Sequence, residues 1–150
     1  MNPAPVSFRP ATVADVGAVC RLLMELKLPT AGVQEWWGGF TVAESEERLV
    51  GVAGVETYAD GALLRSVAVQ PSMRGGGLAR TLVGKALDTA RDAGAKDVYL
   101  LTTTAERYFP RLGFVAVPRD TIPKSVQASI EFRGACPDTA TAMHLALRDS

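Results

Sequence analysis

Cysteine and histidine are scarce in this chain of 150 residues, and its formal net charge is zero. Two cysteines, Cys20 and Cys136, and one histidine, His144, supply neither a disulfide framework nor the ligands of a metal site, so we expect no metal. Lys and Arg number 16, as do Asp and Glu. This balance argues against a general electrostatic attraction to nucleic acid or to a membrane, and we expect neither as a partner.

Long apolar runs are absent as well. No stretch approaches the roughly 20 apolar residues that a membrane-spanning helix needs. The first ten residues, MNPAPVSFRP, do not contain the apolar core of a signal peptide. We therefore expect a cytoplasmic protein. Hydrophobic residues make up 47% of the chain, which is sufficient for a core at this length. No linker, repeat or low-complexity segment divides it, so we predict one domain over residues 1–150.

Strands and helices alternate along the sequence. Helices are predicted after a Thr12/Asp15 capping box, with an apolar stripe ended by Pro29, and over residues 78–93, followed by Gly94. Shorter helices are predicted over 31–40 and over 104–114, the latter interrupted by Pro110. Alternation and apolar runs predict strands over 6–10, 40–44, 48–58, 62–69, 96–102 and 142–147, with a hairpin at Asp60 and Gly61. This order indicates a mixed α/β fold.

Three consecutive glycines stand where a helix begins, in AVQPSMRGGGLARTLVGKAL, residues 68–87. A helix start presents free amides and the positive end of the helix dipole, and glycine lets an anion approach the backbone closely. Arg74 adds a fixed positive charge directly before the glycines. A turn that only needs positive φ angles would require one glycine, so the pattern favours anion binding.

Two common phosphate-binding motifs do not fit. The chain contains no Gly-x-x-x-x-Gly-Lys-Ser/Thr string, and a Gly-x-Gly-x-x-Gly fingerprint fails because residue 80 is Arg. The string does match Arg/Gln-x-x-Gly-x-Gly/Ala over Arg74, Gly75, Gly76, Gly77, Leu78 and Ala79. A nucleotide-binding α/β module remains an alternative.

The segments LLRSVAVQPSMRGGGLARTLVGKAL and VYLLTTTAERYFPRLGF resemble the GCN5-related N-acetyltransferases, over most of the chain. The resemblance implies their fold, a twisted mixed sheet splayed at its two central strands, and acetyl-CoA as the donor. It implies that the amides of residues 74–79 hold the pyrophosphate, with Arg80 nearby, and that the backbone of Val67 and Val69 pairs with pantetheine. Thr102 stands where many relatives have an Asn that contacts this arm; it is equally an ordinary threonine at a strand end.

The general acid departs from the pattern of the family. Many relatives have a tyrosine four residues before the glycine of the Gly-Phe pair, and this sequence has Phe109 there. Tyr108, one residue earlier, is the candidate acid if Pro110 distorts the helix; otherwise it is a packed core aromatic, and the thiolate leaves unassisted or with a proton from water. No convincing nucleophile accompanies the motif, which favours direct attack by the acceptor amine in a ternary complex.

Glu56 is the candidate general base, because its strand is otherwise apolar and burial would raise its pKa. It is otherwise a glutamate that faces solvent. Arg65, inside another apolar strand, either pairs with Glu56 or binds an anionic group of the acceptor. Thr30, in a segment where relatives have an acceptor-binding loop, and Ser66 are further candidate substrate contacts. Trp36 and Trp37 follow that segment and either line the acceptor side or pack on the core.

A finer resemblance is to the small arsenic-resistance N-acetyltransferases, carried by LPTAGV, VETYADGALLRSVAV and PKSVQASIEFRGACPDTATAMHL. It implies a small amine acceptor of the arsinothricin, phosphinothricin or glutamate type and a role in detoxification. Cys136, next to a proline, is more simply structural than a metalloid ligand. The alternatives are a polyamine, an aminoglycoside or a protein N-terminus as acceptor, or a CoA-binding regulator without catalysis. Many relatives dimerise, so a homodimer is a further possibility.

Overall fold

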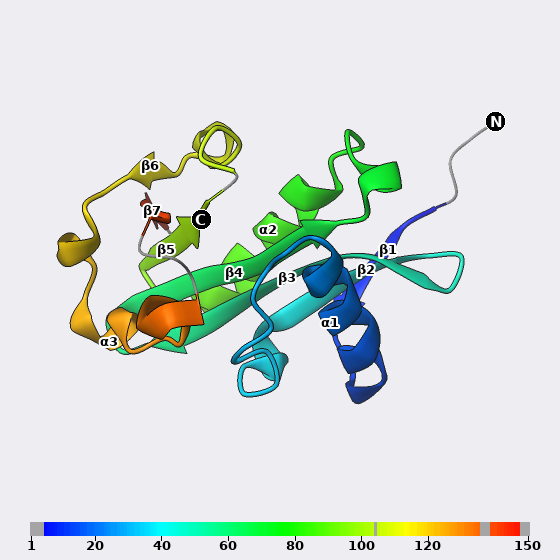
Figure 1. Ribbon diagram of the computed structural model, residues 1–150, viewed down its shortest axis with the longest axis horizontal. Helices are drawn as coiled ribbons and strands as arrows, with labels where there is room; N and C mark the ends of the chain where they lie inside the picture. Colours follow the sequence, from blue (N-terminus) through cyan, green and yellow to red (C-terminus); the bar gives the residue numbers. More distant parts are fainter. Residues whose placement is uncertain (1–4, 104, 136–138, 148–150) are drawn as a thin grey trace. The chain divides into compact units, whose positions relative to one another are not determined.

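The computed structural model describes residues 5–103, 105–135 and 139–147 (Figure 1). Cys136, which the sequence analysis treats as structural, lies outside these residues. Seven strands of the described part form one mixed sheet in the hydrogen-bonded order β1-β2-β3-β4-β5-β7-β6. Their bounds are β1 Ser7–Pro10, β2 Phe40–Ser45, β3 Arg48–Tyr58, β4 Gly61–Val69, β5 Asp97–Thr102, β6 Val115–Ala116 and β7 Thr141–Ala146.

The sheet combines antiparallel and parallel pairing. β1 with β2, β2 with β3, β5 with β7 and β6 with β7 are antiparallel, whereas β4 and β5 are parallel. The parallel pair follows from the helix that joins its strands, because such a crossover returns the chain to the same edge of the sheet. A mixed sheet with connecting helices is the predicted fold class.

Within the described ranges, three α-helices accompany the sheet, namely α1 Val16–Glu25, α2 Leu78–Asp92 and α3 Lys124–Gln127. The prediction for α2 is confirmed to within one residue at each end, whereas α1 begins directly after the Thr12/Asp15 box as predicted but ends at Glu25, before Pro29. Thr12 N–H donates to the Asp15 carboxylate at 2.7 Å ahead of α1. At the end of α2, Gly94 has a φ of +92°, and Ala95 N–H donates to Ala90 O at 3.0 Å. α3 was not predicted.

Two predicted short helices are wrong. Over 31–40 the chain forms successive turns and a single 3₁₀ turn, Trp37–Gly39, because the two glycines provide no side chain to pack and aromatic contacts decide the local path. Of the segment 104–114, the described residues 105–114 form a turn and the 3₁₀ segment Phe109–Leu112. Pro110 has no N–H to donate in a helix, and Gly113, with a φ of +98°, ends this segment.

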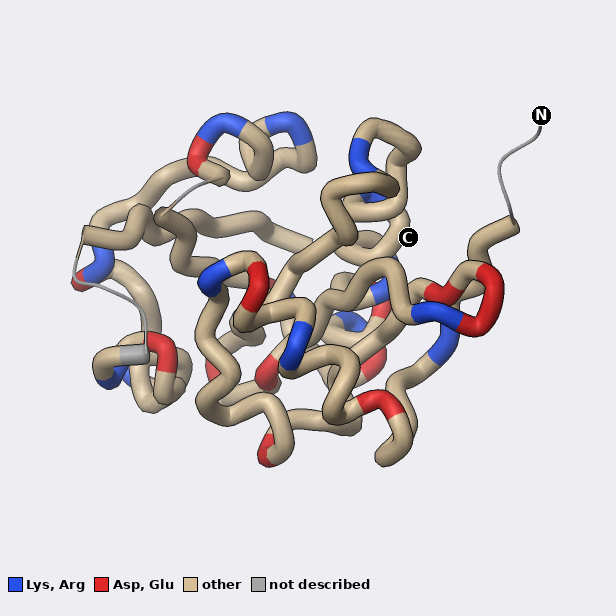
Figure 2. The backbone as a smooth tube through the Cα atoms, turned by 45° about the vertical axis from the view of Figure 1, so that its right-hand side comes forward, with Lys and Arg blue, Asp and Glu red and all other residues tan. Residues whose placement is uncertain are grey.

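The chain divides into two compact units. Unit 1 comprises Met1–Gly54 and Ser66–Ala86, and unit 2 comprises Val55–Arg65 and Leu87–Ser150. Acidic and basic residues are interspersed along the backbone (Figure 2). No helix in the described ranges is both long and apolar enough to cross a membrane.

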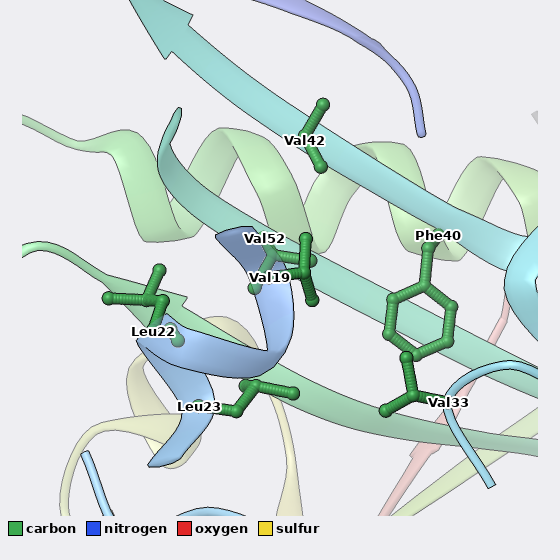
Figure 3. Packing of buried hydrophobic residues seen from close by; sticks show 8 residues of the cluster. Val19, Leu22, Leu23, Val33, Phe40, Val42 and Val52 are labelled. Carbon is green, nitrogen blue, oxygen red and sulfur yellow. The ribbon is translucent and has the colours of Figure 1, made fainter. Parts of the chain in front are cut away.

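Unit 1 has its core between α1 and the strands β2 and β3. Figure 3 shows apolar side chains of α1 meeting those of the two strands. Phe40, 2% exposed, lies in this cluster, and its ring points toward Val33. The ring crosses β3 at Gly54, where an added Cβ would lie 2.5 Å from its Cζ. The buried members of the cluster are Val19, Leu22, Leu23, Val33, Phe40, Val42, Val52 and Ala68.

The first half of α2 lies on the opposite face of β3. Gly51 and Val52 are neighbours in the strand, so they face opposite sides of the sheet. Val52 joins the α1 cluster, and a Cβ on Gly51 would lie 2.8 Å from Leu82 Cδ1 of α2. Two helices therefore cover the two faces of β3 within unit 1.

Unit 2 is built on the hairpin tip of β3 and β4 and on strands β5, β6 and β7. Asp60 and Ser125 connect the hairpin turn to α3, since Ser125 Oγ donates to Asp60 Oδ2 at 2.9 Å. The apolar cluster beneath them contains the buried residues Leu63, Ile122, Val126 and Ala142. His144, the single histidine, pairs with Asp97 at 2.8 Å on β5.

Candidate active site

The glycine loop of unit 1 joins the end of β4 to the start of α2. Gln70 N–H donates to Val50 O at 2.8 Å, and the 3₁₀ turn Pro71–Met73 then turns the chain away from the sheet. Gly75 and Gly77 have φ angles of +88° and +81°. These left-handed angles favour glycine, so two of the three glycines are required by the turn itself. Gly76 has no such angle, so the backbone conformation does not require glycine at this position.

Free amides gather at the end of this loop. The first helical bond of α2 runs from Thr81 N–H to Gly77 O at 3.1 Å, so the amides of Leu78, Ala79 and Arg80 precede the helical ladder. A Cβ added at Gly75 or Gly77 would meet nothing within 4 Å. Open space, free amides and the positive end of a 15-residue helix therefore coincide, an arrangement that can bind an anion.

The two arginines of the motif differ in their local contacts. Arg74 is exposed, and its Nε donates to Val69 O at 3.4 Å, which directs the side chain back toward the end of β4. Arg80 is exposed on the first turn of α2. Leu78, by contrast, is only 9% exposed, so its side chain belongs to the core and only its amide is available to a ligand.

The end of β4 directs two amides away from β3. Because Gln70 N–H points to β3 and successive residues of a strand alternate, the N–H groups of Val67 and Val69 point to the other edge of β4. Among the described residues, β4 pairs with β5 only at Ala62–Val98 and Leu63–Tyr99. Ser66, with a φ of +57°, lies directly before these amides. The backbone of this segment is thus presented for hydrogen bonding in the manner of an added strand.

A buried charged cluster occupies unit 2. Arg65 Nη1 lies 2.7 Å from Glu56 Oε2, and neither side chain is exposed. The same guanidinium lies 3.7 Å, through Nη2, from Glu131 Oε2. The hydroxyl of Tyr58 donates to the other oxygen of Glu56, Oε1. The sequence left two roles open for Arg65, and in the structure Arg65 pairs with Glu56.

Tyr58 extends the cluster toward the half-buried surface of β3. Burial raises the pKa of Tyr58 well above its usual range, and the hydrogen bond to Glu56 raises it further. A hydrogen bond with Ser129 acts in the opposite direction. Tyr58 therefore stays a neutral donor at physiological pH, and a substrate would have to replace an existing contact before it reached the Glu56 carboxylate.

Sequence reasoning missed Tyr58, Ser129 and Glu131. The only available signal was the expected burial of Arg65, which requires anionic partners. Nothing in the sequence points to Glu131 as one of them, because it comes from the irregular segment Glu131–Ala135. A contact of this kind is set by tertiary folding.

Tyr108 and Phe109 are neighbours in the segment YFPRLGF, but they differ in burial. Phe109 is 7% exposed and meets Phe114 edge to face, with the ring centroids 5.8 Å apart. Tyr108 is half-buried and immediately precedes the 3₁₀ segment. Thr102 is buried, and its Oγ1 accepts a hydrogen bond from Ala105 N–H at 2.9 Å. In this conformation, Thr102 supports the turn that carries Tyr108.

The segment between α1 and β2 belongs to unit 1. Thr30 is half-buried, and its carbonyl accepts a hydrogen bond from Val33 N–H at 3.2 Å. Trp37 stacks on Phe40, with the ring centroids 5.3 Å apart. Of the predicted site residues, the structure therefore brings together Glu56 with Arg65 in unit 2, and the strand end with the glycine loop in unit 1.

Comparison with known proteins places the chain in a family. The profile of the acetyltransferase (GNAT) family matches residues 20–114, which include the glycine loop, β4, α2 and Phe114. An amino-acid acetyltransferase of Mycobacterium tuberculosis is 33% identical over 135 residues, covering 78% of this chain and 75% of that protein. The chain therefore belongs to the acetyltransferase (GNAT) family.

Solved structures agree on the fold. N-acetylglutamate synthase from Neisseria gonorrhoeae, in complex with coenzyme A and N-acetyl-glutamate, matches 99% of this chain with a TM-score of 0.83 and 23% identity. This chain covers 36% of that longer protein. Rv2747 from Mycobacterium tuberculosis, in complex with CoA and NLQ, has a TM-score of 0.73 and 25% identity, with 95% of this chain and 99% of that one covered. The protein has the GNAT fold and is an N-acetyltransferase of the GNAT type, with acetyl-CoA as its donor.

Proposed function

We propose that the protein acetylates the α-amino group of a small amino acid that has an anionic side chain. The likeness to an amino-acid acetyltransferase over three quarters of both chains is the observation that carries this proposal. Glutamate and its analogues phosphinothricin and arsinothricin fit this class, and the analogues are the acceptors that the arsenic-resistance resemblance implies. Polyamines, aminoglycosides and protein N-termini are the competing acceptors.

The glycine loop is the proposed site for the pyrophosphate of the donor. The amides of residues 74–79 and the side chain of Arg80 provide hydrogen bonds and positive charge at the start of α2. Gly76 fits this role because it has no left-handed φ, and the nearest atom to an added Cβ is Met73 O at 3.8 Å. A ligand, and not the fold, would then be the reason for glycine at this position.

The backbone of Val67 and Val69 is the proposed site for the pantetheine arm. Acetyl-CoA supplies a thioester carbonyl as the group that the amine attacks. An amide of this strand end would stabilise the negative charge that develops on the carbonyl oxygen, as a preorganised donor does. Thr102 would contact the arm only after it released Ala105 N–H.

Tyr108 remains the proposed acid and Glu56 the proposed base. In the overall step, the amine nitrogen forms a bond to the acetyl carbon, the carbon–sulfur bond breaks, and the nitrogen loses a proton as the thiolate gains one. Tyr108 would donate the proton that the thiolate gains. Glu56 would accept the proton that the amine nitrogen loses. Tyr58 would relay this proton, since Tyr58 donates to Glu56 and is less buried. Ser66 and Thr30 stay proposed contacts to the acceptor.

Release of the CoA thiol with a panel of amines tests the proposal. Glutamate, phosphinothricin and arsinothricin should support release, whereas spermidine and a short peptide should not. Gly76→Val should raise the KM for acetyl-CoA by about 10-fold or more, with an unchanged melting temperature. Gly84→Ala, a glycine of α2 with open space around it, is the matched control and should leave the KM unchanged.

The possible outcomes separate the alternatives. Release with spermidine or the peptide alone would replace the amino-acid proposal with one of the competing acceptors. Saturable binding of acetyl-CoA without release for any amine would favour the non-catalytic regulator. Competition by ATP and not by CoA would favour the nucleotide-binding module.

A further inference from the structure

The indole nitrogen of Trp37 is a buried donor without an acceptor. Within the described part of the chain, Trp37 Nε1 is buried and has no hydrogen-bond partner. The indole N–H is a donor only, so it cannot be satisfied by another N–H group. Most buried donors in folded proteins have a partner, and one without it destabilises the fold. Trp37 Nε1 therefore needs an acceptor that does not come from the described residues.

The position of this ring is fixed by the core. The indole stacks on Phe40 with a centroid distance of 5.3 Å and an interplanar angle of 22°. Phe40 is itself held, because it is 2% exposed, its ring points toward Val33, and it lies across Gly54 (Figure 3). Rotation of the indole would break the stacking on a buried ring. The N–H group therefore keeps one orientation, and an acceptor reaches it once the atoms that cover it move aside.

The segment that carries Trp37 is a compact series of turns. Lys27, with a φ of +60°, ends the first helix, and Leu28 N–H donates to Leu23 O at 2.8 Å. Further turns are closed by Val33 N–H to Thr30 O at 3.2 Å and by Gly39 N–H to Trp36 O at 2.8 Å. The indole thus belongs to a loop held by its own backbone bonds. Loops of this kind, on a rigid support, commonly carry binding residues.

We infer that Trp37 Nε1–H donates a hydrogen bond to a carboxylate of the acceptor amino acid. The inference rests on the proposed function. The partner must be an oxygen acceptor, and a carboxylate accepts a stronger hydrogen bond than a neutral group. The attacking amine is excluded as the partner, because its lone pair must remain free to form the new bond. Trp37 then contributes to the selection of amino acids over simple amines.

Replacement of Trp37 by β-(3-benzothienyl)alanine tests this hydrogen bond. The analogue has sulfur in place of the N–H group and otherwise keeps the shape of the ring. The KM for glutamate should rise about 10-fold, and the KM for acetyl-CoA should change less than 2-fold. The unfolding midpoint should stay the same or rise, because the free protein loses an unpaired donor. The same replacement at Trp36 is the matched control and should leave both KM values unchanged.

Two acceptors identify the carboxylate. If the hydrogen bond goes to the α-carboxylate, 4-aminobutyrate, which lacks that group, should have similar KM values for the wild type and the Trp37 variant. If it goes to the side-chain carboxylate, 2-aminobutyrate, which lacks that one, should show this equality. An equal loss with glutamate, both analogues and a simple amine would overturn the inference, because the ring would then act by packing alone.

NMR gives a readout independent of turnover. The chain has two tryptophans, so two indole N–H signals are expected, and Trp36→Phe assigns them. Glutamate should shift the Trp37 signal downfield and leave that of Trp36 in place. If the wild type acetylates glutamate, but glutamate leaves the Trp37 signal in place and the replacement at Trp37 leaves the KM for glutamate unchanged, the Trp37 inference alone is overturned. A wild type that acetylates no carboxylate-bearing amine would overturn the proposed function together with it.

Discussion

Replacement of Arg65 by methionine should lower the free energy of unfolding by about 3 to 5 kcal/mol, the usual effect of removing one partner of a buried ion pair. Arg65 Nη1 is 2.7 Å from Glu56 Oε2, and neither side chain is exposed. Glu131 Oε2 is 3.7 Å from Nη2 of the same guanidinium. Methionine would leave two carboxylates in the interior without the cation between them.

A graded series follows from the geometry. Glu56→Gln should cost about 2 to 4 kcal/mol, because glutamine has one acceptor oxygen: when this oxygen accepts from Tyr58, the amide NH2 group faces Arg65, which loses both an acceptor and a charge. Glu131→Gln should cost about 1 kcal/mol or less, because 3.7 Å is longer than a hydrogen bond. The double variant Glu56→Leu/Arg65→Met should lose less free energy of unfolding than the sum of the losses of its two single variants. Each single variant leaves one charge of this pair buried without its partner, whereas the double variant removes both charges.

Urea unfolding at pH 7, followed by circular dichroism and fluorescence, measures these differences. Arg91→Met is the control, because its pair with Asp88 at 3.0 Å is exposed and should contribute under about 0.5 kcal/mol. A loss of less than about 1 kcal/mol for Arg65→Met, with an unchanged m value, would refute the view that this cluster holds unit 2 together.

Three further changes concern unit 1. Arg9 holds the pKa of Asp15 at about 2, below the ordinary 3.8, so Asp15→Asn should lose about 1 to 2 kcal/mol at pH 7. The difference from the wild type should vanish as pH falls from about 4 to 2 in urea titrations; a constant difference would contradict the linkage. Gly54→Ala should lose about 1 to 3 kcal/mol, because its Cβ would lie 2.5 Å from the Phe40 ring, and calorimetry would detect this. Ser66→Val should be less stable than Ser66→Gly by about 1 kcal/mol in urea, since its φ is +57°; equal stabilities would count against strain there.

Local signals made α2 and its glycine loop predictable. The apolar stripe sets the helix, and Gly94 at its end and the glycines at its start mark both termini within the sequence itself. The same signals predict an anion site, because free amides follow from where a helix begins. This part of the candidate site depends on residues close together in the chain.

The aromatic segments were less predictable because tertiary contacts decide them. The spacing of Trp36 and Trp37 is compatible with a helix, but stacking of Trp37 on Phe40 favours a 3₁₀ turn. Glu131 reaches Arg65 from a segment without regular periodicity. No local pattern encodes such partners, whereas the pairing of Arg65 with Glu56 was within reach because they lie on strands joined by a hairpin.

Each of the strands β3 and β4 is divided between the two units. This division determines which unit is complete first during synthesis on the ribosome. Unit 1 needs no residue beyond Ala86, so it has all of its parts while the rest is still being synthesised. The hairpin tip, Val55–Arg65, must wait for β5 and β7. During this interval Ala62, Leu63 and Leu64, which are buried in the final fold, remain uncovered by their partners. A nascent chain paused in this interval therefore presents an apolar hairpin to chaperones.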